Sequence, residues 1–259
     1  MLSLSLPLEQ MVLFFFVFVR VAAILFAVPF LEPRNIPILI KVGLAVSVTW
    51  ILLPQIDLAP PSVESSPVAF ALGIASEVAI GLIIGIMVKL LFAGVQLAGQ
   101  MAGFQMGFAI ANVVDPASSM QIPMLSQFFN LFAFMIFLSL NIHYYFIKAL
   151  VDGFEILPFW SAQFDGDLYQ LIMATTANAF KIAVQLGAPV MVALLLTSVA
   201  LGLTARTVPQ MQIFIVAMPV KIILGLLFLG FSLPYCMTFL KSAFMTLSRN
   251  VQGLMHLLM

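Results

Sequence analysis

Charged residues are scarce in this chain. Of its 259 residues only 8% are charged, whereas 63% are hydrophobic. Soluble domains carry about 25% charged residues, so the scarcity of charge excludes an ordinary soluble domain and indicates an integral membrane protein. The formal net charge is zero. Because no cluster of lysine and arginine occurs, the sequence offers no basic patch for nucleic acid.

Cysteine and histidine are nearly absent as well. The single cysteine, Cys236, excludes an internal disulfide and a cysteine-based metal site. The two histidines, His143 and His256, lie far apart, without the spacing of metal ligands. No H-E-x-x-H, G-x-S-x-G or P-loop pattern occurs, and no glycine-flanked serine has a histidine or lysine partner. We therefore expect a protein that is not an enzyme and that needs no cofactor or metal.

Long apolar runs dominate instead. Six apolar segments can be drawn, at residues 11–31, 36–53, 68–98, 124–151, 171–203 and 213–234, followed by an amphipathic piece at 235–259. A membrane span needs about 20 apolar residues, whereas a single helix over residues 68–103 would be on the order of 54 Å long. Residues 168–203 give a similar length. Such helices either break, as Pro189 suggests for the second, or project beyond the bilayer into other protein. The sequence thus predicts an all-α membrane protein with about six long, kinked helices in hairpins.

Charged side chains inside these runs are the first candidate sites. A charge at mid-membrane costs about 3 kcal/mol or more, so each one needs a partner or water. Because the set is mostly basic, we expect ion pairs between packed helices or between subunits instead of a proton relay. The residues are Arg20, Glu77, Lys89, Lys181 and Lys221.

Glycines at four-residue spacing form a second pattern. Gly81 and Gly85 make a small-xxx-small face that lets helices approach closely, and Gly99 and Gly103 repeat the spacing. Packing within the chain and packing against another subunit fit this pattern equally well.

Residues 99–123, GQMAGFQMGFAIANVVDPASSMQIP, fit neither neighbouring apolar segment. An apolar, glycine-rich, proline-broken backbone between membrane segments is tolerated only where protein buries it or where it lines a cavity. We therefore expect function here. Asp115 precedes a proline, so we interpret it as a turn former and not as a catalytic acid. The aromatic residues of the later connection, Phe154, Phe159, Trp160 and Phe164, are interpreted as an interfacial belt.

Loop charge predicts the topology. The second and fourth connections are acidic and would face away from the cytoplasm. The first connection and the fifth, which carries Arg206, are basic and would face it. Both termini would then lie outside, although Lys241 and Arg249 oppose that assignment.

Several motifs together resemble the FliR family, the flagellar type III export-gate proteins whose injectisome relatives are called SctT. They are TARTVPQMQIF at 204–214, MPVKI at 218–222, PRNIP at 33–37, KVGLA at 41–45, QLAG at 96–99, GFQMGF at 103–108 and ANVVDP at 111–116. The resemblance covers nearly the whole chain. One departure is Gln212, where most relatives are expected to have asparagine.

The resemblance implies an assembly. One copy of such a subunit joins several copies of FliP and FliQ in a right-handed helical export gate. Residues 1–170 would be FliP-like, and residues 171–259 a FliQ-like hairpin with a C-terminal helix. The gate belongs to the flagellar basal body at the bacterial inner membrane, with much of it raised above the membrane plane. Unfolded flagellar polypeptides pass through it, and membrane lipid surrounds part of it.

The resemblance also implies two sites. Residues 99–123 match a loop that plugs the central pore. The plug residues would be Met106, Gly107, Phe108, Ile110, Asn112, Val113, Val114, Asp115, Pro116 and Met120. The connection with Arg206, Pro209 and Gln210 would lie at the cytoplasmic entrance, against FlhB. A small-molecule secondary transporter is the alternative, but such transporters usually repeat their broken helices in both halves, and here the broken stretch occurs once.

Overall fold

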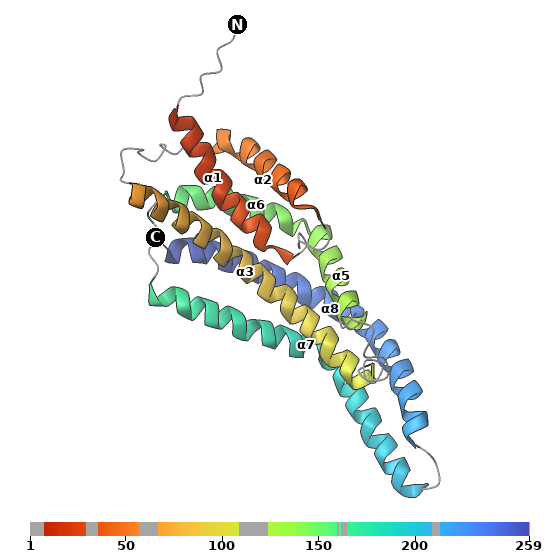
Figure 1. Cartoon of the computed structure of the whole chain (residues 1–259). Helices are drawn as coiled ribbons and strands as arrows, with labels where there is room; N and C mark the ends of the chain where they lie inside the picture. The colour runs from red at the N-terminus through yellow and green to blue at the C-terminus, as the bar shows by residue number, and fades with distance from the viewer. Residues whose placement is uncertain are drawn as a thin grey trace. The chain divides into compact units, whose positions relative to one another are not determined.

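The computed structural model describes residues 8–29, 36–56, 67–108, 124–159, 161, 165–208 and 213–258. Over these residues it contains helices and no strand. In chain order they are α1 (Leu8–Ala27), α2 (Ile38–Leu52), the short 3-10 helix η2 (Leu53–Gln55), α3 (Pro67–Met106), α5 (Met124–Ser139), α6 (Ile142–Ile156), α7 (Gly166–Thr207) and α8 (Ile213–Leu257) (Figure 1). Among the described residues five helices are long and apolar enough to cross a membrane, and there are six such spans if α5 and α6 are taken together as one. The prediction of an all-α membrane protein is confirmed.

Three helices are much longer than a membrane span. α3 has 40 residues, α7 has 42 and α8 has 45. At about 1.5 Å per residue each is on the order of 60 Å long, against a hydrocarbon core of about 30 Å. α7 continues through Pro189, and α8 continues through Pro219 and Pro234. The expected break at Pro189 is therefore absent from α7. The piece at 235–259 is not a separate element, because α8 runs through it to Leu257.

The apolar segment at 124–151 is divided between two helices. α5 ends at Ser139 and α6 begins at Ile142. Between them Asn141 has a left-handed backbone, with φ 53°, a conformation that asparagine tolerates better than most residues. Leu140 donates its backbone N–H to Ile136 at 3.0 Å, which closes the last turn of α5. Each of the two helices alone, at about 24 Å or less, is too short to span the core.

The chain forms two compact units that interleave along the sequence. Unit 1 comprises Met1–Leu90, Asn141–Thr175 and Met245–Met259, and unit 2 comprises Leu91–Leu140 and Thr176–Phe244. Each unit contains residues from both 1–170 and 171–259. The predicted division at residue 170, into a FliP-like and a FliQ-like part, is a different matter, because it concerns likeness to other subunits. It stays a prediction.

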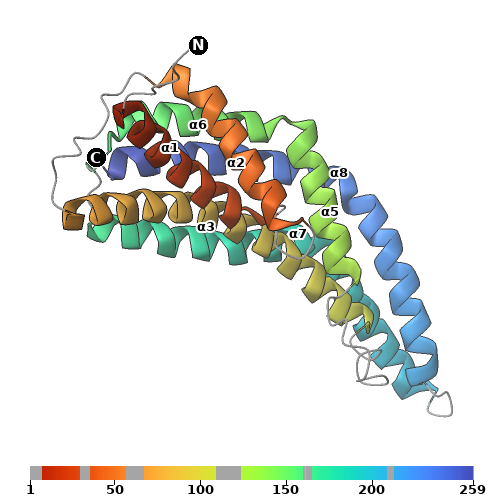
Figure 2. The same cartoon turned by 45° about the horizontal axis from the view of Figure 1, so that its top comes forward.

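Unit 1 is built on helices that approach closely. α1 and α2 lie side by side (Figure 2), and α3 packs against α1 through its glycines. A Cβ atom added at Gly81 would lie 2.5 Å from the Cβ of Ala23 and 2.9 Å from the carbonyl oxygen of Arg20. A Cβ at Gly85 would overlap the Cβ of Ala27. This small-xxx-small face therefore packs within the chain.

Unit 2 has an aromatic centre. The rings of Phe92, Phe137 and Phe244 come from α3, α5 and α8, and all three are buried. Their centroids lie 6.1 Å (Phe92–Phe137), 5.7 Å (Phe92–Phe244) and 5.5 Å (Phe137–Phe244) apart. On the α7 side, Gly94 lets the helices approach, because a Cβ there would lie 2.5 Å from the carbonyl oxygen of Ala179. These four helices therefore share one core.

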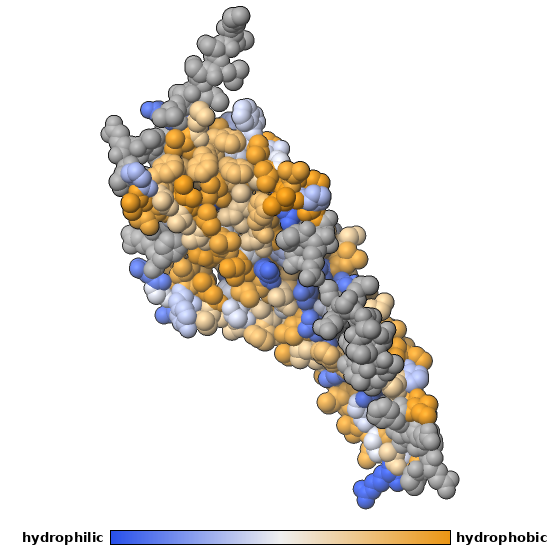
Figure 3. Space-filling view, viewed as in Figure 1, coloured by the Kyte–Doolittle hydropathy of each residue, from blue (hydrophilic) through white to orange (hydrophobic). Residues whose placement is uncertain are grey.

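Large apolar side chains also cover much of the outer surface. In α2 the residues Leu39, Trp50 and Ile51 are 80%, 65% and 64% exposed. Much of the face shown in Figure 3 has the orange of hydrophobic residues. Water is a poor solvent for such a surface, so lipid or other protein must cover it.

Candidate functional site

The last turn of α3 has a defined stop signal. Phe108 donates its backbone N–H to the carbonyl of Gly103, and Gly107 donates to that of Phe104, both at 3.1 Å. Gly107 has a φ of +93°. This pair of bonds around a left-handed glycine is a Schellman motif. The Gly99–Met106 part of the stretch 99–123 is consequently helical and continues α3, which corrects the expectation that the whole stretch lies outside the neighbouring helices.

The end of α3 packs against α8. Met106 is fully buried, and its side chain occupies the space beside Gly225. A Cβ added at Gly225 would lie 2.5 Å from Cε, 2.7 Å from Cγ and 3.0 Å from Sδ of Met106. One residue further on, a Cβ at Gly107 would lie 3.7 Å from Cε of Met218. The close Met106–Gly225 contact, with Met218 near Gly107, thus places the end of α3 beside the segment of α8 between Met218 and Gly225.

The start of α5 is fixed to α3 in a different way. The Ser126 hydroxyl donates a hydrogen bond to the carbonyl of Gln96 at 2.9 Å. A Cβ at Gly99 would lie 2.6 Å from Cα of Ser126 and 2.8 Å from the carbonyl oxygen of Leu125. Here backbone approaches backbone. The two ends that flank residues 109–123 are therefore both anchored, one on α8 and one on α3.

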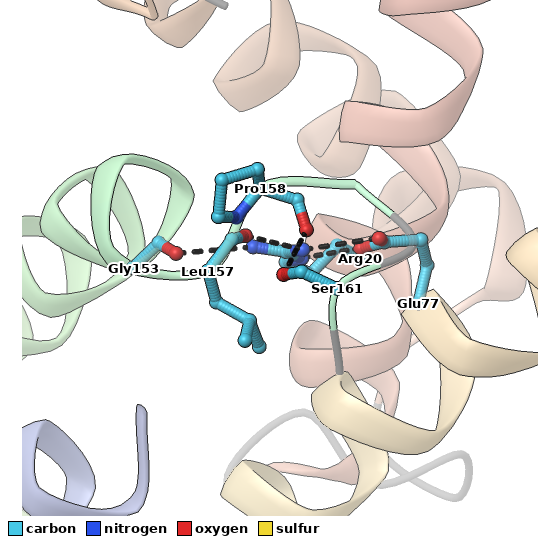
Figure 4. Close-up of polar contacts among 6 residues, drawn as sticks. All are labelled: Arg20, Glu77, Gly153, Leu157, Pro158 and Ser161. Carbon is cyan, nitrogen blue, oxygen red and sulfur yellow. Dashed lines mark hydrogen bonds and ion pairs between the residues drawn. The ribbon is translucent and has the colours of Figure 1, made fainter. Parts of the chain in front are cut away.

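A buried ion pair organises unit 1. Arg20 of α1 is 2% exposed and Glu77 of α3 is fully buried. The Arg20 guanidinium pairs with both carboxylate oxygens, Nε with Oε2 and Nη2 with Oε1, the latter at 3.0 Å (Figure 4). It also donates to the carbonyls of Gly153 at 3.4 Å and Leu157 at 3.3 Å. Its central carbon lies 4.2 Å from the centre of the Phe154 ring.

This arrangement joins three parts of unit 1: α1, α3 and the end of α6. The carbonyls at a helix C-terminus lack intrahelical partners and carry partial negative charge, so a cation suits them. The guanidinium fork can use several acceptors at once. Within the described part of the chain the Arg20–Glu77 pair is internal, so neither residue depends on another subunit for its partner.

Two aspects of this cluster were missed from the sequence. Phe154 is fully buried against Arg20 and is not part of an interfacial belt, and Phe159 lies half-buried with its ring centre 5.9 Å from the guanidinium. Trp160 and Phe164 lie outside the described residues. An arginine inside an apolar run does signal that acceptors are needed, but no residue pattern marks backbone carbonyls as those acceptors.

Among the described residues no group of three or more histidine, cysteine, aspartate and glutamate side chains could hold a metal ion. The described residues offer packing contacts: close approaches between helices, the Arg20–Glu77 ion pair and the end of α3 packed on α8.

Comparison with known proteins identifies the family. The family model described as "Bacterial export proteins, family 1" matches residues 11–247. The chain belongs to this family. It is 33% identical to the flagellar biosynthetic protein FliR of Bacillus subtilis (strain 168), over 94% of this chain and 95% of the relative. It is 31% identical to FliR of Escherichia coli (strain K12), over 90% of this chain and 88% of the relative. The resemblance drawn from the motifs is confirmed.

Only part of the expected plug can be located in this family member. Met106, Gly107 and Phe108 lie at the end of α3 as described above. The remaining plug residues lie outside the described residues; they are Ile110, Asn112, Val113, Val114, Asp115, Pro116 and Met120. Their role, and that of Met106 in a plug, stay predictions.

The lysines behave differently from Arg20 and Glu77. Lys89 and Lys181 are exposed in the isolated chain, and Lys221 is half-buried, so this chain alone does not enclose them. By contrast Lys41 is 2% exposed, with its Nζ 5.8 Å from the Phe26 ring centre. Pairing of the exposed lysines with other subunits stays a prediction.

The connection assigned to the cytoplasmic entrance is only partly described. Arg206 is exposed in the last turn of α7, where a cation complements the helix dipole. Pro209 and Gln210 lie outside the described residues. A contact of this connection with FlhB therefore stays a prediction.

Proposed function

We propose that this export-family protein is a single-copy subunit of a flagellar type III export gate. In that gate it assembles with several copies each of FliP and FliQ, and residues 99–123 close the pore through which unfolded flagellar polypeptides leave the cell. The observation that carries the proposal is likeness over nearly the whole chain to proteins named for flagellar biosynthesis, within a family named for export.

The surface of the isolated chain supports an assembled state. Lys89 is near the middle of the 40-residue α3, and Lys181 lies well inside the 42-residue α7, yet both are exposed. A lysine facing hydrocarbon there would cost about 3 kcal/mol. A carboxylate on a neighbouring subunit would remove that penalty, so we assign Lys89, Lys181 and Lys221 to contacts with FliP or FliQ.

The length of the helices supports the same state. An axis on the order of 60 Å cannot lie within a core of about 30 Å by modest tilt alone. Neighbouring subunits that continue beyond the lipid would cover the remainder. We therefore place the chain in the flagellar basal body at the bacterial inner membrane, with part of each long helix outside the hydrocarbon, and place Arg206 at the cytoplasmic entrance near FlhB.

The plug is the part of the proposal that deletion tests best. Removing residues 107–120 should raise the ion conductance of assembled gates, because the apolar side chains assigned to the seal are lost. The measurement is single-channel conductance of purified gates in planar bilayers. A matched control removes residues 58–65 from the polar second connection and should leave conductance low. Native conductance in gates that assemble with the deletion variant would contradict the assignment of these residues to a plug.

A further inference from the structure

We propose that four residues form a releasable latch between α3 and α8: Met106, Gly107, Met218 and Gly225. The latch holds the end of α3 against α8 in the closed gate, and the two helices separate at this point when the gate opens. The role of the latch in gate opening rests on the proposed export function. The contacts between its residues do not depend on that function, since all of them lie within unit 2 of this chain.

The first component is the space beside Gly225, which holds the Met106 side chain because glycine has no Cβ. Because a Cβ at Gly225 would lie 2.5–3.0 Å from three side-chain atoms of Met106, any larger residue would push the methionine out. Met106 itself is fully buried. The Met106 thioether therefore fills the space that Gly225 leaves on the surface of α8. A smaller residue at 106 would leave a void there, and a larger residue at 225 would clash with Met106.

The second component is the helix stop beside this space. The Schellman motif fixes the direction in which the chain leaves α3 at Gly107. The nearest atom to a Cβ built there is Cε of Met218, at 3.7 Å. Met218 of α8 is thus the nearest side chain to the open space beside Gly107, while Met106 of α3 fills the space beside Gly225.

Three properties make this contact easy to release. Methionine is unbranched and flexible, so it can repack against different surroundings at small cost. The contact is van der Waals packing of a thioether against a glycine, so separating the two residues costs apolar packing only. Pro219 lies between Met218 and Gly225, and a proline inside a helix removes one backbone hydrogen bond and allows the helix to bend.

The contact between the start of α5 and α3 is harder to separate. At the start of α5, the approach of Gly99 to Ser126 and Leu125 is between backbones, and the Ser126–Gln96 hydrogen bond adds a directional contact. Separating these groups would expose polar backbone as well as apolar surface. The asymmetry of the two flanks assigns the movement to the α3–α8 side.

A reversible cross-link tests the latch. Met106→Cys and Gly225→Cys would be combined in a Cys236→Ala background, because Cys236 is the native thiol on the same helix. The Cβ of residue 225 would lie 2.7 Å from Cγ of Met106, and adding one C–C bond of about 1.5 Å limits the Cβ–Cβ distance to about 4.2 Å. Disulfides need about 3.5–4.5 Å, so the pair should oxidise readily.

The export assay uses cells in which this variant replaces the native chain. Oxidation should protect both thiols from a maleimide reagent and lower secretion of a flagellar substrate at least tenfold, and a reductant should restore secretion. The control is Met106→Cys with Gly230→Cys, since a Cβ at the exposed Gly230 meets nothing within 4 Å. It should neither cross-link nor respond to oxidant.

The outcomes separate the latch from the plug. Failure of the Met106–Gly225 pair to cross-link would overturn the contact, and a complete cross-link with normal secretion would overturn the latch. Because the 107–120 deletion also removes Gly107, a shorter deletion of residues 109–120, which keeps all four latch residues, tests the plug by itself.

A second pair of variants covers the case in which cysteines disturb assembly. Gly225→Ala should displace Met106 and increase gate conductance several-fold, whereas Gly230→Ala should not. Adding Met106→Ala to Gly225→Ala makes room for the new methyl group and should bring conductance back toward that of the native gate. Equal conductance of the two alanine variants, in gates that assemble, would count against the latch.

Discussion

Replacing Glu77 by leucine tests the buried ion pair of unit 1. The substitution places an apolar side chain of similar size on α3 and removes the carboxylate. The Arg20 guanidinium then retains the carbonyls of Gly153 and Leu157, at 3.3–3.4 Å, and the rings of Phe154 and Phe159. Removing one partner of a buried pair is worth about 3–5 kcal/mol of stability. Because those other contacts remain, we expect the lower end, about 3 kcal/mol, which is on the order of a hundredfold in the folding equilibrium.

The assay is thermal unfolding of the purified chain in detergent, followed by tryptophan fluorescence. For a chain of this size, about 3 kcal/mol should lower the melting temperature by about 6–12 °C. The control replaces both partners, Arg20→Met with Glu77→Leu, which removes the uncompensated charge. Apolar replacements of whole buried pairs are often neutral or stabilising, so the double variant should melt nearer the native temperature than Glu77→Leu does. A single variant as stable as the native chain, or a double variant less stable than the single one, would refute the reasoning.

Two further substitutions test the packing of each unit by the same melting assay. Gly85→Ala should destabilise the chain by about 1–3 kcal/mol, because the new methyl group would overlap Ala27, whereas Gly43→Ala, with nothing within 4 Å of its Cβ, should be neutral or slightly stabilising. Phe244→Ala should cost about 3–5 kcal/mol, because a fully buried ring in the aromatic centre of unit 2 is lost; a native-like melting temperature would show that the ring cluster does not stabilise the unit.

Composition and apolar run length sufficed to predict the class of fold. Scarce charge and runs of about 20 apolar residues can be satisfied in lipid only by structures that pair all their backbone groups internally, and helices do so within one segment. The same physics indicated that Arg20 and Glu77 need partners. Hydropathy could not find the boundary at Asn141, because one residue in a left-handed conformation changes the chain's direction without changing its polarity.

The candidate site was only partly predictable for a related reason. Glycine spacing signals that helices can approach, but it does not say which helix approaches which. That Gly81 meets Ala23, or that Gly225 receives Met106, depends on how residues far apart in sequence come together. Proline was also a poor guide inside the long helices: Pro189 removes one backbone hydrogen bond, but α7 continues through it.

Co-purification tests the central claim most directly. An affinity tag on this chain, expressed from its native locus, would be used to extract it from membranes in mild detergent, and mass spectrometry would quantify what elutes with it. Membership of an export gate predicts FliP and FliQ in the eluate, each in molar excess over the tagged chain. Recovery of the chain as a stable homo-oligomer, free of FliP and FliQ, would contradict the account.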